Sequence, residues 1–181
     1  MTTISNHPHP NASTQRLVGC FAGMGIVFSV VGSLGLLIAG IVFGLPLLVI
    51  MIPFLIGLSL PLFQLTSLHP AITVEENGLR LNPLVFPSSF VEWDDLLEIT
   101  EHTLIKPPAP SKIQKYTKRE HHQGEMILAK MGRLPFHYRI VGLMGGQGFK
   151  PTFAISNRTH VEYKMLRSEI KKHLSKSEAT K

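Results

Sequence analysis

The sequence predicts a membrane-anchored α+β protein, in which a two-helix transmembrane hairpin precedes a mostly antiparallel β domain that ends in one helix. Three observations predict this fold class. The 58 residues from 17 to 74 contain no Asp, Glu, Lys or Arg. From residue 71 onward, short alternating apolar runs separated by turn residues indicate strands. After residue 159, apolar residues recur at the spacing of an amphipathic helix.

The apolar stretch that begins at Leu17 is too long for a single membrane crossing. One crossing needs about 20 apolar residues for a hydrocarbon core of about 30 Å, and this run continues for 47 residues. We therefore predict a hairpin over residues 16–66, with helices at 17–38 and 47–65 and a turn near 39–46. A cleaved signal peptide fits less well, because the apolar sequence does not end after the first helix.

The distribution of basic residues predicts the orientation of the hairpin. Only Arg16 precedes the apolar stretch, whereas the other 17 of the 18 basic residues follow it. The positive-inside rule then places both termini in the cytoplasm, as expected for a multi-pass integral membrane protein. Neither predicted span contains an ionisable side chain, which argues against an ion or proton path formed by this chain alone.

Small residues recur at a spacing of four in the first predicted helix. The helix-packing candidates are Gly25, Ser29 and Ser33, because small side chains allow helices to approach closely. This face has two interpretations. It packs against the second helix of the same chain, or it joins a second copy of the protein or another membrane protein.

Both ends of the chain are predicted to be disordered tails, at residues 1–15 and 176–181. The first is polar and interrupted by proline, and we expect its His7 and His9 to be solvated rather than to bind a metal ion.

The soluble domain is expected over residues 70–175. Asn77-Gly78 between alternating apolar residues predicts a β-hairpin. Further strands are expected at residues 90–93, 96–105, 125–131, 134–141 and 149–155. Thr159 and Glu162 match a capping box at the start of a helix that runs to about residue 175, with Asn157 as the alternative cap.

Two segments of this domain carry a resemblance to a known family. Residues 72–81 (ITVEENGLRL) and 90–99 (FVEWDDLLEI) resemble the opening of bacterial pleckstrin-homology-like (PH-like) domains. Such domains often follow a transmembrane hairpin and end in a single helix. The resemblance implies a PH-like antiparallel β-barrel or sandwich that acts as a binding or scaffolding module rather than as an enzyme.

We find no motif that predicts a catalytic, cofactor or metal site. The glycine cluster 142–148 lacks the Gly-Lys-Ser/Thr order of a phosphate-binding loop. Asp94 and Asp95 follow Trp93 directly and fit a turn, and the pair His121-His122 fits a solvated loop. Cys20 is the only cysteine, so an intrachain disulfide is excluded. We therefore predict a protein that is not an enzyme and that has no cofactor.

The charge of the soluble part suggests its partners. All 12 acidic residues follow the apolar stretch, which leaves this part with a net charge of +5. A tethered basic domain is expected to meet anionic lipid headgroups rather than nucleic acid. The predicted contact residues lie in a basic loop and on the C-terminal helix: Lys106, Lys112, Lys115, Lys118, Arg119, Lys164, Arg167 and Lys171. The alternative for the loop is a solvated segment whose charges only aid solubility.

The sequence thus predicts a membrane-anchored scaffold or adaptor that binds anionic lipid headgroups or a partner protein at the cytoplasmic face. A homo-oligomer is compatible with this prediction. The alternative function is an accessory or assembly factor of a multi-subunit membrane complex.

Overall fold

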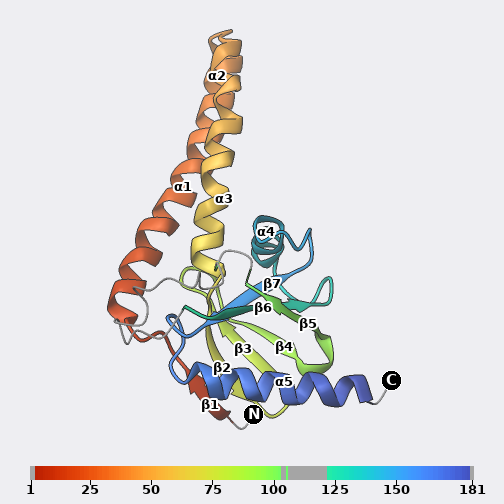
Figure 1. Cartoon of the computed structure of the whole chain (residues 1–181). Coiled ribbons are helices and arrows are strands. Elements are labelled where there is room, and N and C mark those ends of the chain that lie inside the picture. Colours follow the sequence, from red (N-terminus) through yellow and green to blue (C-terminus); the bar gives the residue numbers. More distant parts are fainter. Residues whose placement is uncertain (1–2, 103–104, 106–121, 180–181) are drawn as a thin grey trace, which may run out of the picture.

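A long segment of three helices projects from a sheet domain in the computed structural model (Figure 1), which describes residues 3–102, 105 and 122–179. The helices are α1 (Ala12–Val42), α2 (Pro46–Ile50) and α3 (Ile52–Ser67). The segment Ser13–Val42 of α1 is long and apolar enough to cross a membrane, whereas α3 is apolar but shorter. Helix α3 packs along α1, and α2 lies at the tip farthest from the sheets.

Glycine and proline determine where these helices begin and end. The chain turns after α1 at Gly44, whose φ of +63° is a conformation that favours glycine. Pro46 then opens α2, and a proline also occupies the first turn of α3, where its missing N–H is not required. Pro61 lies inside α3.

Four strands form the first antiparallel sheet, in the order β1-β2-β3-β4. They are β1 (Thr3–His7), β2 (Ala71–Glu75), β3 (Gly78–Asn82) and β4 (Ser89–Glu92). The predicted hairpin at Asn77-Gly78 joins β2 to β3 and is confirmed. A Cβ atom at Gly78 would lie 2.1 Å from the carbonyl oxygen of Val91, so only glycine fits there.

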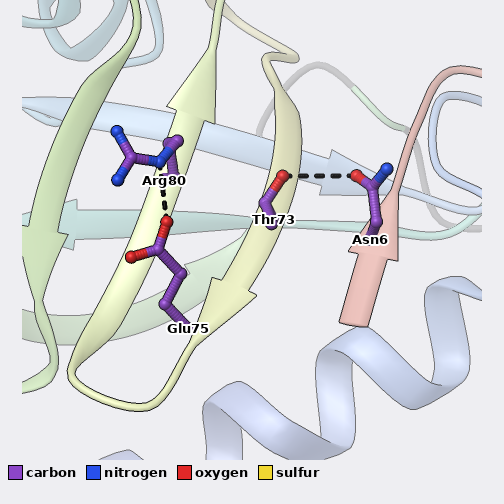
Figure 2. A network of polar contacts seen from close by, with 4 residues as sticks. All are labelled: Asn6, Thr73, Glu75 and Arg80. Carbon is purple, nitrogen blue, oxygen red and sulfur yellow. Dashed lines mark hydrogen bonds and ion pairs between the residues drawn. The ribbon is translucent and has the colours of Figure 1, made fainter. Parts of the chain in front are cut away.

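Strand β1 corrects the prediction of a disordered N-terminal tail. It pairs with β2 along the sheet edge, and its His7 side chain is fully buried. Figure 2 shows the hydroxyl of Thr73 donating to the side-chain oxygen of Asn6 across this pair, at 3.2 Å. In the same view Arg80 of β3 reaches Glu75 of β2 at 2.6 Å. The N-terminal residues form a strand because they hydrogen-bond to the edge of β2. The polar composition of these residues does not indicate such pairing.

Three further strands form the second antiparallel sheet, in the order β5-β6-β7. They are β5 (Leu96–Glu101), β6 (Gly124–Ala129) and β7 (Thr152–Ser156), and the short 3₁₀ helix η1 (Trp93–Asp95) precedes β5. Strands β6 and β7 are almost entirely buried. Ile127 and Phe153 face the first sheet in the main core, whereas Met126 and Ala154 face the opposite way. This explains why both strands are nearly continuous apolar runs.

Helix α4 (Phe136–Met144) replaces the strand predicted at residues 134–141. A short apolar run does not by itself distinguish a strand from a buried helix. Pro135 precedes the first turn and Gly145 follows the last one, as is typical of helix ends. The side chain of Tyr138 enters the main core, and that of Val141 packs on the opposite face of the second sheet.

Helix α5 (Tyr163–Ala179) closes the domain. Its apolar face buries Leu166 and Ile170 in the main core, as the helical spacing predicted. The predicted capping box is wrong, because Glu162 has a φ of +55° and the helix begins one residue later. The disordered tail predicted at 176–181 is also wrong over 176–179, where α5 continues.

The structure therefore confirms an α+β chain with a long apolar N-terminal helix and two antiparallel sheets. The PH-like topology of the sheets stays a prediction.

Candidate functional site

The small-residue face of α1 lies against α3 of the same chain. A Cβ atom on Gly25 would lie 2.7 Å from the side chain of Leu62. The hydroxyl of Ser29 is buried and donates to the backbone carbonyl of Leu55. Ser33 donates within α1, to the carbonyl of Ser29 at 2.7 Å. The contacts of Gly25 and Ser29 are therefore those expected if this face packs against the second helix of the same chain.

The outer surfaces of the helices remain almost wholly apolar. Within Ser13–Val42 of α1, only 11% of the most apolar stretch of 18 residues is buried. Phe28 and Ile41 of α1 are 71% and 72% exposed, and Phe54 of α3 is 65% exposed. In water such a surface is costly, at roughly 25 cal/mol per Å² of apolar area. It is a surface suited to an apolar solvent or partner.

Backbone hydrogen bonds fix the base of the helices to the sheets. Leu68, just after α3, accepts from the N–H of Ala154 in β7 at 2.6 Å. The carbonyl of Thr66 accepts from the N–H of Leu84 at 3.1 Å. On the α1 side, a Cβ atom at Gly19 would lie 3.0 Å from the side chain of Leu84. Both helices therefore contact the domain directly, in addition to their chain connections.

A stack of aromatic rings crosses the same junction. Phe63 of α3 stacks on Phe86 of the β3–β4 connection, with ring centres 5.6 Å apart. Phe86 in turn stacks on His137 of α4 at 4.2 Å. His137 contacts Tyr138 at 4.4 Å, and Tyr138 meets Phe153 of β7 edge to face. The stack links α3 to the main core through α4.

Histidines from distant segments form a cluster beside this junction. His9 precedes α1, His69 follows α3, His102 follows β5 and His160 precedes α5. The ring centres of His69 and His102 are 5.4 Å apart, and those of His9 and His160 are 5.7 Å apart. His69 lies 6.2 Å from His160 and joins the two pairs. This corrects the prediction of a solvated His9, which is 8% exposed.

Backbone groups determine which ring nitrogens in the cluster carry protons. A carbonyl can only accept, so His9 donates from Nδ1 to Thr159 at 2.7 Å, and His160 donates from Nε2 to Pro70 at 2.9 Å. Nδ1 of His160 accepts from the N–H of Ser156 at 3.3 Å. His160 is thereby held as the neutral imidazole.

Burial keeps these histidines neutral. Burial, together with the smaller effect of nearby histidines, lowers the pKa of His69 to about 3 and that of His160 to about 4. The pKa of His9 and the pKa of His102 are also lowered, chiefly by burial. The sequence offered no signal for this cluster, because its members are separated by up to 151 residues. Among the residues the structure describes, no group of three or more His, Cys, Asp or Glu side chains could hold a metal ion.

The predicted basic contact residues fall into two sets. Lys106, Lys112, Lys115, Lys118 and Arg119 lie outside the described residues. Lys164, Arg167 and Lys171 lie on α5, and the last two bind the carboxylate of Glu125 at 2.7 Å and 3.2 Å. The hydrogen bond from Arg167 to Glu125 also raises the pKa of the guanidinium. These two cations thus help to hold α5 on the second sheet.

The two neighbouring aspartates noted in the sequence, Asp94 and Asp95, lie in different surroundings. Asp95 is buried and lies 3.4 Å from Lys130 and 3.0 Å from Arg133. Asp94 lines an open polar groove, and α5 contributes His173 to the same groove. The groove is lined by Glu76, Asn77, Glu92, Trp93, Asp94 and His173.

No family model, curated protein or solved structure matches this chain.

Proposed function

We propose that the chain is a bacterial integral membrane protein, in which α1 and the α2–α3 segment cross the bilayer and hold the sheet domain at the cytoplasmic surface. The exposed apolar side chains of Phe28, Ile41 and Phe54 favour a lipid environment. Residues 46–67, which contain α2 and α3, would reach about 33 Å as a helix, which matches a hydrocarbon core of about 30 Å.

The pairing of β1 with β2 carries this proposal. His7 pairs with Ile72, so the residues before α1 and after α3 belong to one sheet. Both ends of the helical segment must then lie on one side of a membrane. The segment between them crosses an even number of times, and its length and apolar surface favour two crossings. The basic residues of the domain favour the cytoplasm for that side.

Labelling of single cysteines tests this topology. In a Cys20→Ser background, Ile4→Cys reports on β1, Phe43→Cys on the turn and Lys172→Cys on α5. We expect a membrane-impermeant maleimide to modify Phe43→Cys in right-side-out vesicles, and Ile4→Cys and Lys172→Cys only in inverted vesicles. Modification of Ile4→Cys and Lys172→Cys from opposite sides would contradict two crossings. Modification of all three from one side would contradict any crossing.

We further propose that the sheet domain is a non-enzymatic, PH-like scaffold or adaptor and that α5 offers its contact surface to a partner protein. Figure 1 places α5 at the end of the domain away from α2. A bilayer around α1 and α3 would leave that end in water. The position of α5 therefore favours a protein partner over lipid headgroups for Lys164 and its neighbours.

Site-specific photo-crosslinking in native membranes tests the adaptor role. A photoreactive residue at Lys172 on α5 should give a discrete adduct that weakens at high salt, because the surface is basic. The same group at Leu97, which is exposed on β5, is the matched control. Equal adducts at both positions, or adducts with lipid alone at Lys172, would contradict a protein contact on α5.

The alternative of an assembly factor that docks through Gly25, Ser29 and Ser33 receives no support from the structure. Those residues contact α3 or α1 of their own chain.

A further inference from the structure

Helix α4 and the loop after it expose a set of large apolar side chains. We name the set of Phe136, Leu143, Met144 and Phe149 the α4 patch. Phe136 is 64% exposed and Phe149 is 58% exposed, whereas Leu143 and Met144 are 41% and 39% exposed. The opposite face of α4 is buried and includes Tyr138, Ile140 and Val141. Four such side chains within 14 residues are more than scattered surface apolar residues would give.

The α4 patch lies at the end of the domain that faces the helical pair. Helix α4 packs against α3, and the stack of Phe63, Phe86 and His137 holds the two together. Figure 1 shows α4 beside the base of α3, on the side of the sheets toward α2 and opposite to α5. The exposed apolar residues of α4 are therefore carried by a helix that packs beside the base of α3.

The loop that carries Phe149 is folded tightly onto α4. A Cβ atom at Gly142 would lie 2.0 Å from the carbonyl oxygen of Lys150, so the two backbones approach where only glycine fits. The N–H of Gln147 donates to the carbonyl of Gly142 at 2.8 Å. These contacts hold Phe149 close to the C-terminal end of α4.

The sequence segment that contains the α4 patch carries basic residues and no acidic ones. No acidic residue occurs between Glu125 and Glu162, whereas five basic residues do: Lys130, Arg133, Arg139, Lys150 and Arg158. Two of these, Lys130 and Arg133, pair with Asp95. Exposed aromatic and aliphatic side chains beside basic ones are typical of elements that lie in the headgroup region of an anionic membrane. A soluble acidic partner would account for the charges, but not for the position of α4 beside the base of α3.

We infer that the α4 patch inserts into the headgroup–acyl boundary of the cytoplasmic leaflet and forms a second membrane contact, separate from the crossing helices. This inference rests on the proposed function, since it requires α1 and α3 to lie in the bilayer. The contact fixes the tilt of the domain and turns α5 toward the cytoplasm. Side chains of an interfacial helix reach about 5–10 Å into the boundary.

Depth measurements with spin labels on the full chain in anionic lipid nanodiscs test this inference. Phe136→Cys and Phe149→Cys carry the label in a Cys20→Ser background. Phe28→Cys on α1 is the lipid reference, and Met165→Cys on α5 is the water reference. We expect labels at 136 and 149 to be more accessible to oxygen than to a water-soluble nickel complex, as at 28, with the reverse ratio at 165.

The outcomes separate this inference from the proposed function. If label 28 reports lipid while labels 136 and 149 match label 165, the patch does not contact the bilayer and the inference is overturned. If those two labels are shielded from both reagents, a protein covers the patch and the inference is equally overturned. If label 28 itself reports water, the crossing helices are refuted and the inference falls with them.

Discussion

At the scale of single residues, His160 shows how backbone contacts select a protonation state. Its two ring nitrogens face a carbonyl and an N–H, a pattern that only the neutral ring can satisfy. Around it lie His9, His69 and the hydroxyl of Thr159. A proton on Nδ1 would oppose the N–H of Ser156 and add a charge beside other histidines, so the fold resists protonation of His160.

This arrangement predicts acid sensitivity with a defined sign. The folded pKa of His160 is about 4, below its ordinary value of 6.5. Between these pH values the unfolded chain binds a proton that the folded chain does not. The free energy of unfolding therefore falls as the pH falls through this window, by up to about 1.4 kcal/mol per pH unit for each such histidine.

The variant His160→Gln removes one titrating group and should reduce that slope. Reversible unfolding in mixed micelles from pH 4 to 8 measures it, and above pH 6.5 the two proteins should show parallel curves. An equal slope for His160→Gln and the natural protein between pH 4 and 6.5 would show that His160 does not contribute.

At the scale of elements, the α1–α3 contact depends on small residues at particular positions. Gly25→Leu should destabilise the helical pair by about 1–3 kcal/mol, because its side chain would overlap Leu62. Gly35→Leu is the matched control, since a Cβ at Gly35 would meet no atom of another described segment within 4 Å. Resistance to denaturing detergent measures the effect. Equal losses in both variants would mean that the contact with Leu62 does not matter.

Local sequence signals predicted some elements and missed others for identifiable reasons. Asn77-Gly78 predicted its hairpin correctly because that dipeptide favours the turn regardless of distant contacts. Strand β1 was missed because the edge of β2, more than 60 residues away, provides its hydrogen bonds. The strand predicted at residues 134–141 is wrong, because a short run with several apolar residues does not by itself distinguish a strand from a helix. In the fold most of these residues form α4, which packs against α3 and β7.

At the scale of the whole molecule, the helices and the sheet domain are joined by more than the chain. The hydrogen bonds of Leu68 and Thr66 and the aromatic stack all connect α3 to the domain. The sequence indicates each part separately, but nothing in it places Phe86 between Phe63 and His137. Such a junction arises only when the tertiary structure forms, which is why the predicted site residues did not include it.

Phe86 should therefore control how rigidly the domain is held relative to α1 and α3. Phe86→Ala removes the central ring of the stack and should allow the domain to move relative to α1. Spin labels at Ile41→Cys and Lys172→Cys, in a Cys20→Ser background, should show a broader distance distribution in this variant. Phe90→Ala, in β4, is the matched control, because the ring of Phe90 contacts Arg80 instead of α3. A distribution that broadens equally in both variants, or in neither, would show that the stack does not orient the domain.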